Sequence, residues 1–202
     1  MFGNLQNPVW NMAWKGCLDM NPVRLDQFRN HDFDRGAPRW REMLWLIVDA
    51  FAMSSWIPGS RWRVVVLRLF GARIGKGVVI KPHVQVKFPW RLVVGDHVWI
   101  GERAWIDNLA TVTIGNQVAL SQGAYLCTGS HDWSRPGFDL ITRPITIGDG
   151  AWIAAKSVIG PGTIVGEGTV VGLGCVATGA LEPWGVYSGA PAKLIRERVV
   201  AG

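Results

Sequence analysis

The hydrophobic positions of the chain recur at every sixth residue over much of its length. The series forms three groups of three hexads separated by slips of two residues, then pauses, then resumes as six unbroken hexads. Fourteen of the fifteen positions are Ile, Leu or Val: Ile74, Ile80, Val86, Val94, Ile100, Ile106, Ile114, Leu120, Leu126, Ile147, Ile153, Ile159, Val165, Val171 and Ala177. A period of six fits neither a helix nor an alternating strand, and it predicts short strands joined by corners around a three-sided prism.

Two further positions of the hexad carry a pattern of their own. Glycine follows the aliphatic residue in eight units, which predicts a tight turn there: Gly75, Gly95, Gly101, Gly115, Gly148, Gly160, Gly166 and Gly172. Four places after the aliphatic residue, small or β-branched residues predominate: Val78, Val84, Val98, Ala104, Ala110, Val118, Ala124, Ser130, Ala151, Ser157, Thr163 and Thr169. We expect this second set to face inward as well.

These patterns predict an all-β domain over residues 74–182, folded as a parallel β-helix with three hexads in each coil. Each aliphatic residue then stacks on its counterpart one coil away. Burying one such side chain is worth about 1.5 to 3 kcal/mol, so the fourteen of them supply most of a core.

The two flanking segments lack the hexad pattern. Residues 1–73 form an N-terminal extension with helices expected over 39–55 and 60–70, which Pro58 and Gly59 separate. The apolar faces of these helices are suited to cover the open first coil, or to contact a membrane surface. Residues 183–202, which include GAPAKLIRER, predict a turn and a short basic C-terminal helix.

The hexad pattern pauses after His131. The segment 132–144 (DWSRPGFDLITRP) has no register with the repeat, so we expect it to leave the prism as an excursion loop. Long loops on a rigid scaffold are common places for binding and catalytic groups. With an ordinary pKa near 6.5, an imidazole here is suited to act as a general base, although an isolated histidine can equally be a loop residue with a satisfied hydrogen bond.

Composition and charge exclude several function classes. The formal charge is +6, but the basic residues are spread without a run of five, which argues against a nucleic-acid partner. Three widely spaced cysteines predict neither disulfides nor a zinc knuckle, and therefore a reducing compartment. The N-terminus does not read as a secretion signal, and the apolar stretch 43–57 is too short to span a bilayer. The spacing of His83, His97 and His131 does not suit a three-histidine zinc site, so we expect no metal.

Four stretches resemble one known family, the hexapeptide-repeat acyltransferases. They are WRVVVLRLFGARIGKGVVI, WIDNLATVTIG, CTGSHDWSRPGFDLITRPITIGDGAWI and PAKLIRER, and the resemblance covers about residues 60–198. It is strongest to the subgroup of colanic-acid or capsular-polysaccharide biosynthesis acetyltransferases. The resemblance implies a left-handed β-helix, whereas parallel crossovers are otherwise right-handed in about 98% of cases.

The resemblance also implies a site. His131 would take the proton from the acceptor as it attacks the thioester of acetyl-CoA, and Asp107 and Asn108 would help to bind the acceptor, although both residue types are equally common in polar turns. The residues implied for the donor are, on the pantetheine side, Ala155, Leu173 and Thr178 and, at the phosphates, Lys193 and Arg196. Many relatives have Lys after the threonine, where this chain has Gly179.

The function implied is acetyl-CoA-dependent O-acetylation of a sugar hydroxyl in surface-polysaccharide or related glycan assembly. An N-acetyltransferase on an amino sugar, a transferase for a small xenobiotic alcohol and a purely structural β-helix remain alternatives. The expected assembly is a homotrimer, with outward residues such as Trp99, Trp105 and Trp152 on the flat faces. The expected location is the cytoplasm, with residues 39–70 in peripheral contact with the inner face of the membrane.

Overall fold

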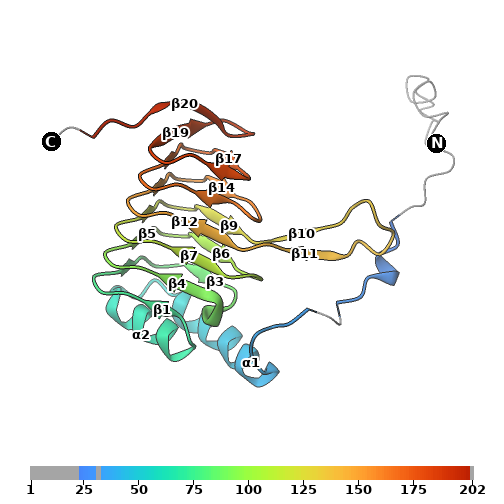
Figure 1. Ribbon diagram of the computed structural model, residues 1–202. Helices are drawn as coiled ribbons and strands as arrows, with labels where there is room; N and C mark the ends of the chain where they lie inside the picture. Colours follow the sequence, from blue (N-terminus) through green and yellow to red (C-terminus); the bar gives the residue numbers. More distant parts are fainter. Residues whose placement is uncertain (1–22, 31–32, 201–202) are drawn as a thin grey trace, which may run out of the picture. The chain divides into compact units, whose positions relative to one another are not determined.

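The computed structural model describes residues 23–30 and 33–200, and from Arg73 onward the chain winds as a parallel β-solenoid (Figure 1). Its strands form three sheets, one for each face of a prism. The first sheet contains β1 (Arg73–Ile74), β4 (Leu92–Val94), β7 (Val112–Ile114), β12 (Ile145–Ile147), β15 (Ile164–Val165) and β18 (Ala180–Leu181). Successive strands along the chain therefore belong to different sheets, as the six-residue period predicts.

The other two faces are built in the same way. The second sheet contains β2 (Val79–Ile80), β5 (Trp99–Ile100), β8 (Ala119–Leu120), β13 (Trp152–Ile153), β16 (Val170–Val171), β19 (Gly185–Ser188) and β20 (Lys193–Glu197). The third contains β3 (Gln85–Val86), β6 (Trp105–Asp107), β9 (Tyr125–Cys127), β14 (Val158–Ile159) and β17 (Val176–Ala177).

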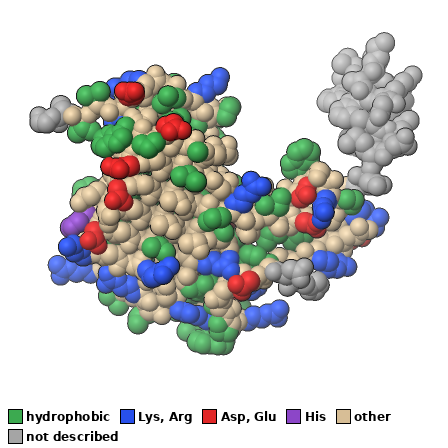
Figure 2. All heavy atoms as spheres, viewed as in Figure 1, with side chains coloured by type: hydrophobic (Ala, Val, Ile, Leu, Met, Phe, Trp, Pro, Cys, Tyr) green, Lys and Arg blue, Asp and Glu red, His purple; other side chains and the backbone are tan. Residues whose placement is uncertain are grey.

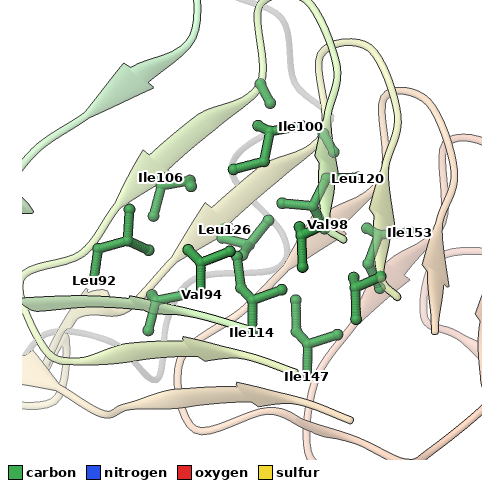
Figure 3. Close-up of a cluster of buried hydrophobic side chains, with 14 of the residues drawn as sticks. Leu92, Val94, Val98, Ile100, Ile106, Ile114, Leu120, Leu126, Ile147 and Ile153 are labelled. Carbon is green, nitrogen blue, oxygen red and sulfur yellow. The ribbon is translucent and has the colours of Figure 1, made fainter. Parts of the chain in front are cut away.

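The hexad residues make up the core of the solenoid. All fifteen are at most 8% exposed, and Figure 3 shows several of them pointing toward one another inside the coils. The register confirms the stacking, since Ile74 pairs with Val94 across the slip of two and Ile147 with Val165 eighteen residues on. Ile114 pairs with Ile147, so the interval between 114 and 147 is absorbed without a loss of register.

Glycine is needed after the hexad residues for a reason other than the tight turn that the sequence predicts. A Cβ added to Gly95 would lie 2.8 Å from the carbonyl carbon of Gly115 on the next coil, and neither backbone has a positive φ. Glycine is therefore required because backbones stack closely, whereas the left-handed corners fall at other residues. Of the second inward set, Ser130 is exposed because the chain leaves the third sheet after Cys127, and Ala110 is half-buried in the two-residue slip between β6 and β7.

The N-terminal helices are α1 (Arg39–Val48), continued by a π-helical turn η3 (Asp49–Met53), and α2 (Arg61–Leu69). Trp45 is buried and its indole N–H donates to the carbonyl of Val86 at 2.8 Å, while Met53 and Leu67 are fully buried in the solenoid core. The buried guanidinium of Arg63 donates to the carbonyls that close the loop before α2, namely Ser55, Ile57 and Gly59. These contacts place the two helices over the first coils, as a cap.

Asp49 lies at the start of η3 with one carboxylate oxygen, Oδ1, buried and without a hydrogen-bond partner among the described residues. Burial raises the pKa of this carboxyl to about 6. Because the folded-state pKa is above the ordinary value of 3.8, the fold loses stability as the pH rises from about 4 to about 6, and the cost persists above that range.

We therefore expect Asp49→Asn to stabilise the fold at pH 7.5 and to have no stabilising effect at pH 4. Each pKa unit corresponds to about 1.4 kcal/mol, and partial exposure of the group reduces the gain to about 1 kcal/mol, or about 2–4 °C in Tm. Thermal melts at the two pH values measure it. An equal change at both pH values would show that charge burial is not the cause.

The C-terminal segment is a strand and not the predicted helix. β20 pairs antiparallel with β19, with Ser188 opposite Lys193 and Val186 opposite Arg196. The last parallel strand of the second sheet would otherwise leave a row of N–H and C=O groups unpaired, and β20 satisfies them. Sheet pairing thus overrides the local helix propensity of the sequence.

The predicted excursion loop contains a β-hairpin. Its strands are β10 (Gly129–His131) and β11 (Leu140–Thr142), so the segment between them and residues 143–144 are the irregular parts of the predicted loop. Residues 131–140 form a compact unit with the described residues 23–30, which include the short 3-10 turn η2 (Leu25–Gln27); a hydrogen bond from Arg24 N–H to the carbonyl of Pro136 joins them at 2.7 Å. Within the described residues, no helix combines the length and apolar character needed to cross a bilayer.

Candidate active site

The imidazole of His131 is fixed by contacts with Phe138 of its own hairpin and with Phe28. Its Nδ1 lies 2.8 Å from the carbonyl oxygen of Phe138. The Phe138 ring stacks on the imidazole at a centroid distance of 4.3 Å and an angle of 7°, and Phe28 approaches edge-on at 5.7 Å. A carbonyl oxygen only accepts hydrogen bonds, so Nδ1 carries the proton and Nε2 keeps its lone pair. This is the tautomer that a general base requires.

The backbone of the hairpin holds that carbonyl in place. Phe138 has a φ of +52°, a left-handed conformation that is uncommon for a bulky residue. Asp132 donates its N–H to the carbonyl of Asp139 at 2.8 Å, and Arg135 forms an ion pair with the Asp139 carboxylate at 3.1 Å. Local backbone strain of this kind persists only where the surrounding contacts impose it.

Asp107 lies at the end of β6 on the third face, half-buried, with aromatic neighbours. The hydroxyl of Tyr125 donates to its Oδ2 at 3.3 Å, and the ring of Tyr125 stacks on Trp105 at 4.5 Å and 17°. Burial, with Cys127 and Asp107 nearby, raises the pKa of the Tyr125 hydroxyl, so it remains a proton donor at neutral pH. The predicted residue set contained Asp107 but not Tyr125.

A sequence signal for this aromatic pair does exist. Trp105 and Tyr125 each precede a buried hexad residue, Ile106 and Leu126, and those two residues pair in register. Residues that precede paired hexad positions share the outward side of the same face, because side chains alternate along a strand.

Asn108 is fully buried, unlike Asp107. Its Oδ1 accepts the N–H of Phe88 at 2.8 Å, and its Nδ2 donates to the carbonyl of Phe88 at 2.8 Å. The amide therefore completes the backbone hydrogen bonding of the preceding coil at a place where the two-residue slip interrupts the ladder. Its predicted contact with the acceptor stays a prediction, and the geometry favours a structural role.

The residues expected on the pantetheine side lie at corners of the later coils. Ala155 and Leu173 occupy the same corner on successive coils, where Gly174 N–H donates to the carbonyl of Ala155 at 3.0 Å. Leu173 is 75% exposed, which is unusual for a leucine and leaves its side chain free for an apolar ligand segment. Thr178 follows β17 and is exposed beside Gly160 of the preceding coil.

The two basic residues expected at the phosphates lie on β20. A bulge between Val186 and Tyr187 in the β19–β20 pairing lets the register skip Ile195. Without it, side chains three positions apart on one strand would point to opposite faces. With it, Lys193 and Arg196 lie opposite Ser188 and Val186, on the face of the ribbon away from the buried Tyr187. The structure therefore pairs two exposed cations on one face, as phosphate binding needs.

No group of three or more His, Cys, Asp or Glu side chains suited to a metal ion occurs within residues 23–30 and 33–200. The expectation that the chain needs no metal stays a prediction.

Comparisons with known proteins identify the family of the chain. No family model matches the chain. It is 42% identical over 167 residues to the "Putative colanic acid biosynthesis acetyltransferase WcaF" of Escherichia coli (strain K12), which covers 82% of this chain and 91% of that protein. It is 30% identical over 129 residues to the galactoside O-acetyltransferase of the same organism, covering 62% and 64%.

Solved structures with the same fold include a hexapeptide-repeat acetyltransferase of Vibrio cholerae complexed with acetyl coenzyme A. It superposes with a TM-score of 0.74 at 23% identity, over 87% of this chain and 97% of that one. A galactoside acetyltransferase in complex with coenzyme A superposes with a TM-score of 0.72 at 25% identity, over 82% and 84%. With its solenoid and a relative that is 42% identical along four-fifths of its length, the chain belongs to the hexapeptide-repeat acetyltransferases and is an acyltransferase that uses acetyl-CoA.

Proposed function

We propose that this acyltransferase O-acetylates a sugar hydroxyl in the assembly of a surface polysaccharide or related glycan, with His131 as its general base. The name of the relative from Escherichia coli refers to colanic acid biosynthesis, and a more distant relative is named for galactoside O-acetylation. The observation that carries the residue assignment is the hydrogen bond from His131 Nδ1–H to the carbonyl of Phe138, which leaves Nε2 as a base.

The chemical step follows from that tautomer. Nε2 accepts the proton of the acceptor hydroxyl as its oxygen forms a bond to the acyl carbon. The positive charge that develops on the imidazole is stabilised through Nδ1–H by the Phe138 carbonyl. When the carbon–sulfur bond breaks, the same Nε2–H returns the proton to the leaving thiolate, so the histidine ends the cycle as it began. Acetyl-CoA supplies the activated acyl group as a thioester.

Asp107 and its aromatic neighbours are suited to the acceptor. A carboxylate accepts hydrogen bonds from sugar hydroxyls, and aromatic rings pack against the C–H faces of sugars. Trp105 is 41% exposed and stacks on Tyr125, whose hydroxyl orients the Asp107 carboxylate. We propose that Trp105, Tyr125 and Asp107 form part of the acceptor site.

The donor contacts lead to a prediction. We expect the double variant Lys193→Ala/Arg196→Ala to raise the KM for acetyl-CoA at least tenfold and to leave kcat within about threefold, because each charge-assisted contact is worth about 1.5–3 kcal/mol of binding. Steady-state kinetics at varied acetyl-CoA measure it. A lower kcat with an unchanged KM would contradict the phosphate assignment.

A screen for acetyl transfer tests the proposed function itself. Purified protein and acetyl-CoA are incubated with sugars, amino sugars and small alcohols, and products are identified by a mass increase of one acetyl group. Transfer to a sugar hydroxyl supports the proposal. Transfer only to amines would show an N-acetyltransferase, and transfer only to small alcohols would show a small-alcohol acetyltransferase. No transfer to any acceptor would contradict the proposed function.

We propose a homotrimer as the active assembly. Trp99 and Trp152 lie in register with Ala119 on the second face and are 63% and 45% exposed, which leaves an apolar flat surface for another chain. Light scattering at micromolar concentration is expected to give the mass of three chains. A monomer at that concentration would require each active site to be built from one chain.

We also propose that residues 39–70 bring the enzyme into peripheral contact with the inner face of a membrane. Support comes from the exposure of Trp40 and Trp56, which are 67% and 78% exposed, and from the excess of basic residues in this segment.

A further inference from the structure

The helix α1 and its continuation η3 carry two apolar faces, and only one of them is covered. Trp45 and Met53 point into the end of the solenoid and are at most 1% exposed. The opposite side presents a stripe at spacings of three and four residues along the helix. This outer stripe consists of Trp40, Met43, Leu44, Ile47 and Phe51, which are 46–80% exposed.

The same end of the chain exposes further large apolar side chains in the loop and in α2: Trp56, Ile57, Val65 and Leu69, each at least 50% exposed. In Figure 2, hydrophobic and basic side chains gather over the end of the molecule at which α1 and α2 lie in Figure 1. Isolated exposed apolar residues are ordinary, but a set of this size within thirty residues indicates a contact surface.

The charge around the stripe is strongly positive. Residues 33–76 contain eight Lys or Arg against three Asp or Glu. Asp34 lies 3.5 Å from Arg91, Glu42 accepts from Arg35 at 2.6 Å, and Asp49 is half-buried with its pKa raised to about 6 by desolvation. Arg63 is buried and Arg35 is neutralised by Glu42, which leaves six Lys or Arg against Asp34 and Asp49, so the surface keeps a positive charge that attracts anions.

A groove of about 670 Å³ lies between α2 and the first coil. Val65 and Val79 contribute to its apolar wall, and Arg61, Arg68 and Lys76 supply the cations. The guanidinium of Arg68 is held by the carbonyls of Ile74 and Gly75, which fixes its position in the groove wall.

The Asp96 carboxylate lies near the groove, with Oδ2 at 3.9 Å from Lys76 Nζ and Oδ1 accepting the Lys76 N–H. Asp96 offsets part of the positive charge of Lys76, so Arg61 and Arg68 supply most of the positive charge of the groove. A site of this kind combines an apolar wall with a cationic rim, and it fits a phosphate that carries an alkyl chain.

We propose that this end of the molecule binds the surface of an anionic phospholipid bilayer, with the outer stripe of α1–η3 in the interfacial layer and the groove holding one lipid phosphate with its first methylene groups. The inference deepens the membrane contact within the proposed function and rests on it. A second copy of this chain is a poorer occupant, because pairing two such faces would bring like charges together, whereas an anionic lipid surface is complementary.

Vesicle co-sedimentation in low salt tests the proposal, without acetyl-CoA or any acceptor. We expect the wild type to sediment with vesicles of phosphatidylglycerol and phosphatidylcholine and to remain in solution with phosphatidylcholine alone. Arg61→Glu/Lys76→Glu should lower binding to the anionic vesicles at least tenfold, since each basic residue near such a surface contributes about 1 kcal/mol. Phe51→Ser should lower it as well, through loss of the stripe.

The matched control is Arg103→Glu/Lys156→Glu, which makes the same change in net charge at two exposed positions on later coils. This variant should bind as the wild type does. An equal loss of vesicle binding in both double variants would contradict the proposed lipid site in the groove, because the effect would then come from net charge alone. Undiminished binding by Arg61→Glu/Lys76→Glu would overturn it as well.

Two further measurements exclude other occupants. Inorganic phosphate at 10 mM should not release the protein from vesicles, and release would show a site for free anions. Phe51→Ser should keep the mass of the wild type in light scattering, whereas a smaller assembly would show that the stripe is an interface between copies. Because none of these readouts depends on acetyl transfer, the docking surface and the proposed function fail independently.

Discussion

His131→Ala is expected to lower kcat by about 10² to 10⁴-fold with little change in the KM for acetyl-CoA or in Tm. General-base removal costs rates of this order. The imidazole contacts Phe138 and Phe28 within its own hairpin unit and is not part of the solenoid core, so its loss should leave the coils intact. The measurement is kcat with one good acceptor, together with a thermal melt.

His83→Ala and His97→Ala are the matched controls. Both histidines lie at left-handed corners of the early coils, with φ of 60° and 56°, so each substitution removes an imidazole from the solenoid without touching the hairpin. Both variants should keep most of the activity. Added imidazole should restore part of the rate of His131→Ala and none of any small loss in the controls. A His131→Ala enzyme within threefold of the wild type, or an inactive His97→Ala, would contradict the mechanism.

The sequence predicts the solenoid well because one physical rule determines it. Every coil must bury one aliphatic residue per side, so the period of six is visible in successive residues such as Ile147, Ile153 and Ile159, and all three are buried as predicted. The pause after His131 likewise predicts an excursion. The pairing partner of the last coil carries no such periodic signal, which is why β20 was predicted as a helix.

The details of the site depend on contacts that have no period. The tautomer of His131 is determined by a backbone carbonyl seven residues away, and any residue at position 138 would supply that oxygen. The shared face of Lys193 and Arg196 depends on a bulge, and their spacing of three would place them on opposite faces of a regular strand. Neighbouring polar residues also look alike in sequence, although Asp107 is half-buried and Asn108 fully buried.

The full burial of Asn108 leads to the second prediction, which concerns the stability of the fold. Asn108→Ala should destabilise the fold by about 2–5 kcal/mol, because it leaves the N–H and the C=O of Phe88 unpaired in a buried position at about 1–3 kcal/mol each. At about 2–4 °C for each kcal/mol, Tm should fall by roughly 4–20 °C. Below the new Tm, the KM for the acceptor should stay within about threefold of the wild type. Thermal melts and acceptor kinetics on one preparation measure both.

Asp107→Asn is the matched comparison and should show the reverse pattern. The amide oxygen can still accept the Tyr125 hydroxyl, so Tm should change by less than about 2 °C, while the KM for the acceptor should rise because a carboxylate contact is lost. Asn108→Asp should be nearly as unstable as Asn108→Ala, since a carboxylate facing the carbonyl of Phe88 cannot donate to it. If Asn108→Ala instead melts like the wild type and raises the acceptor KM, Asn108 binds the acceptor and its bond to Phe88 contributes little to the fold.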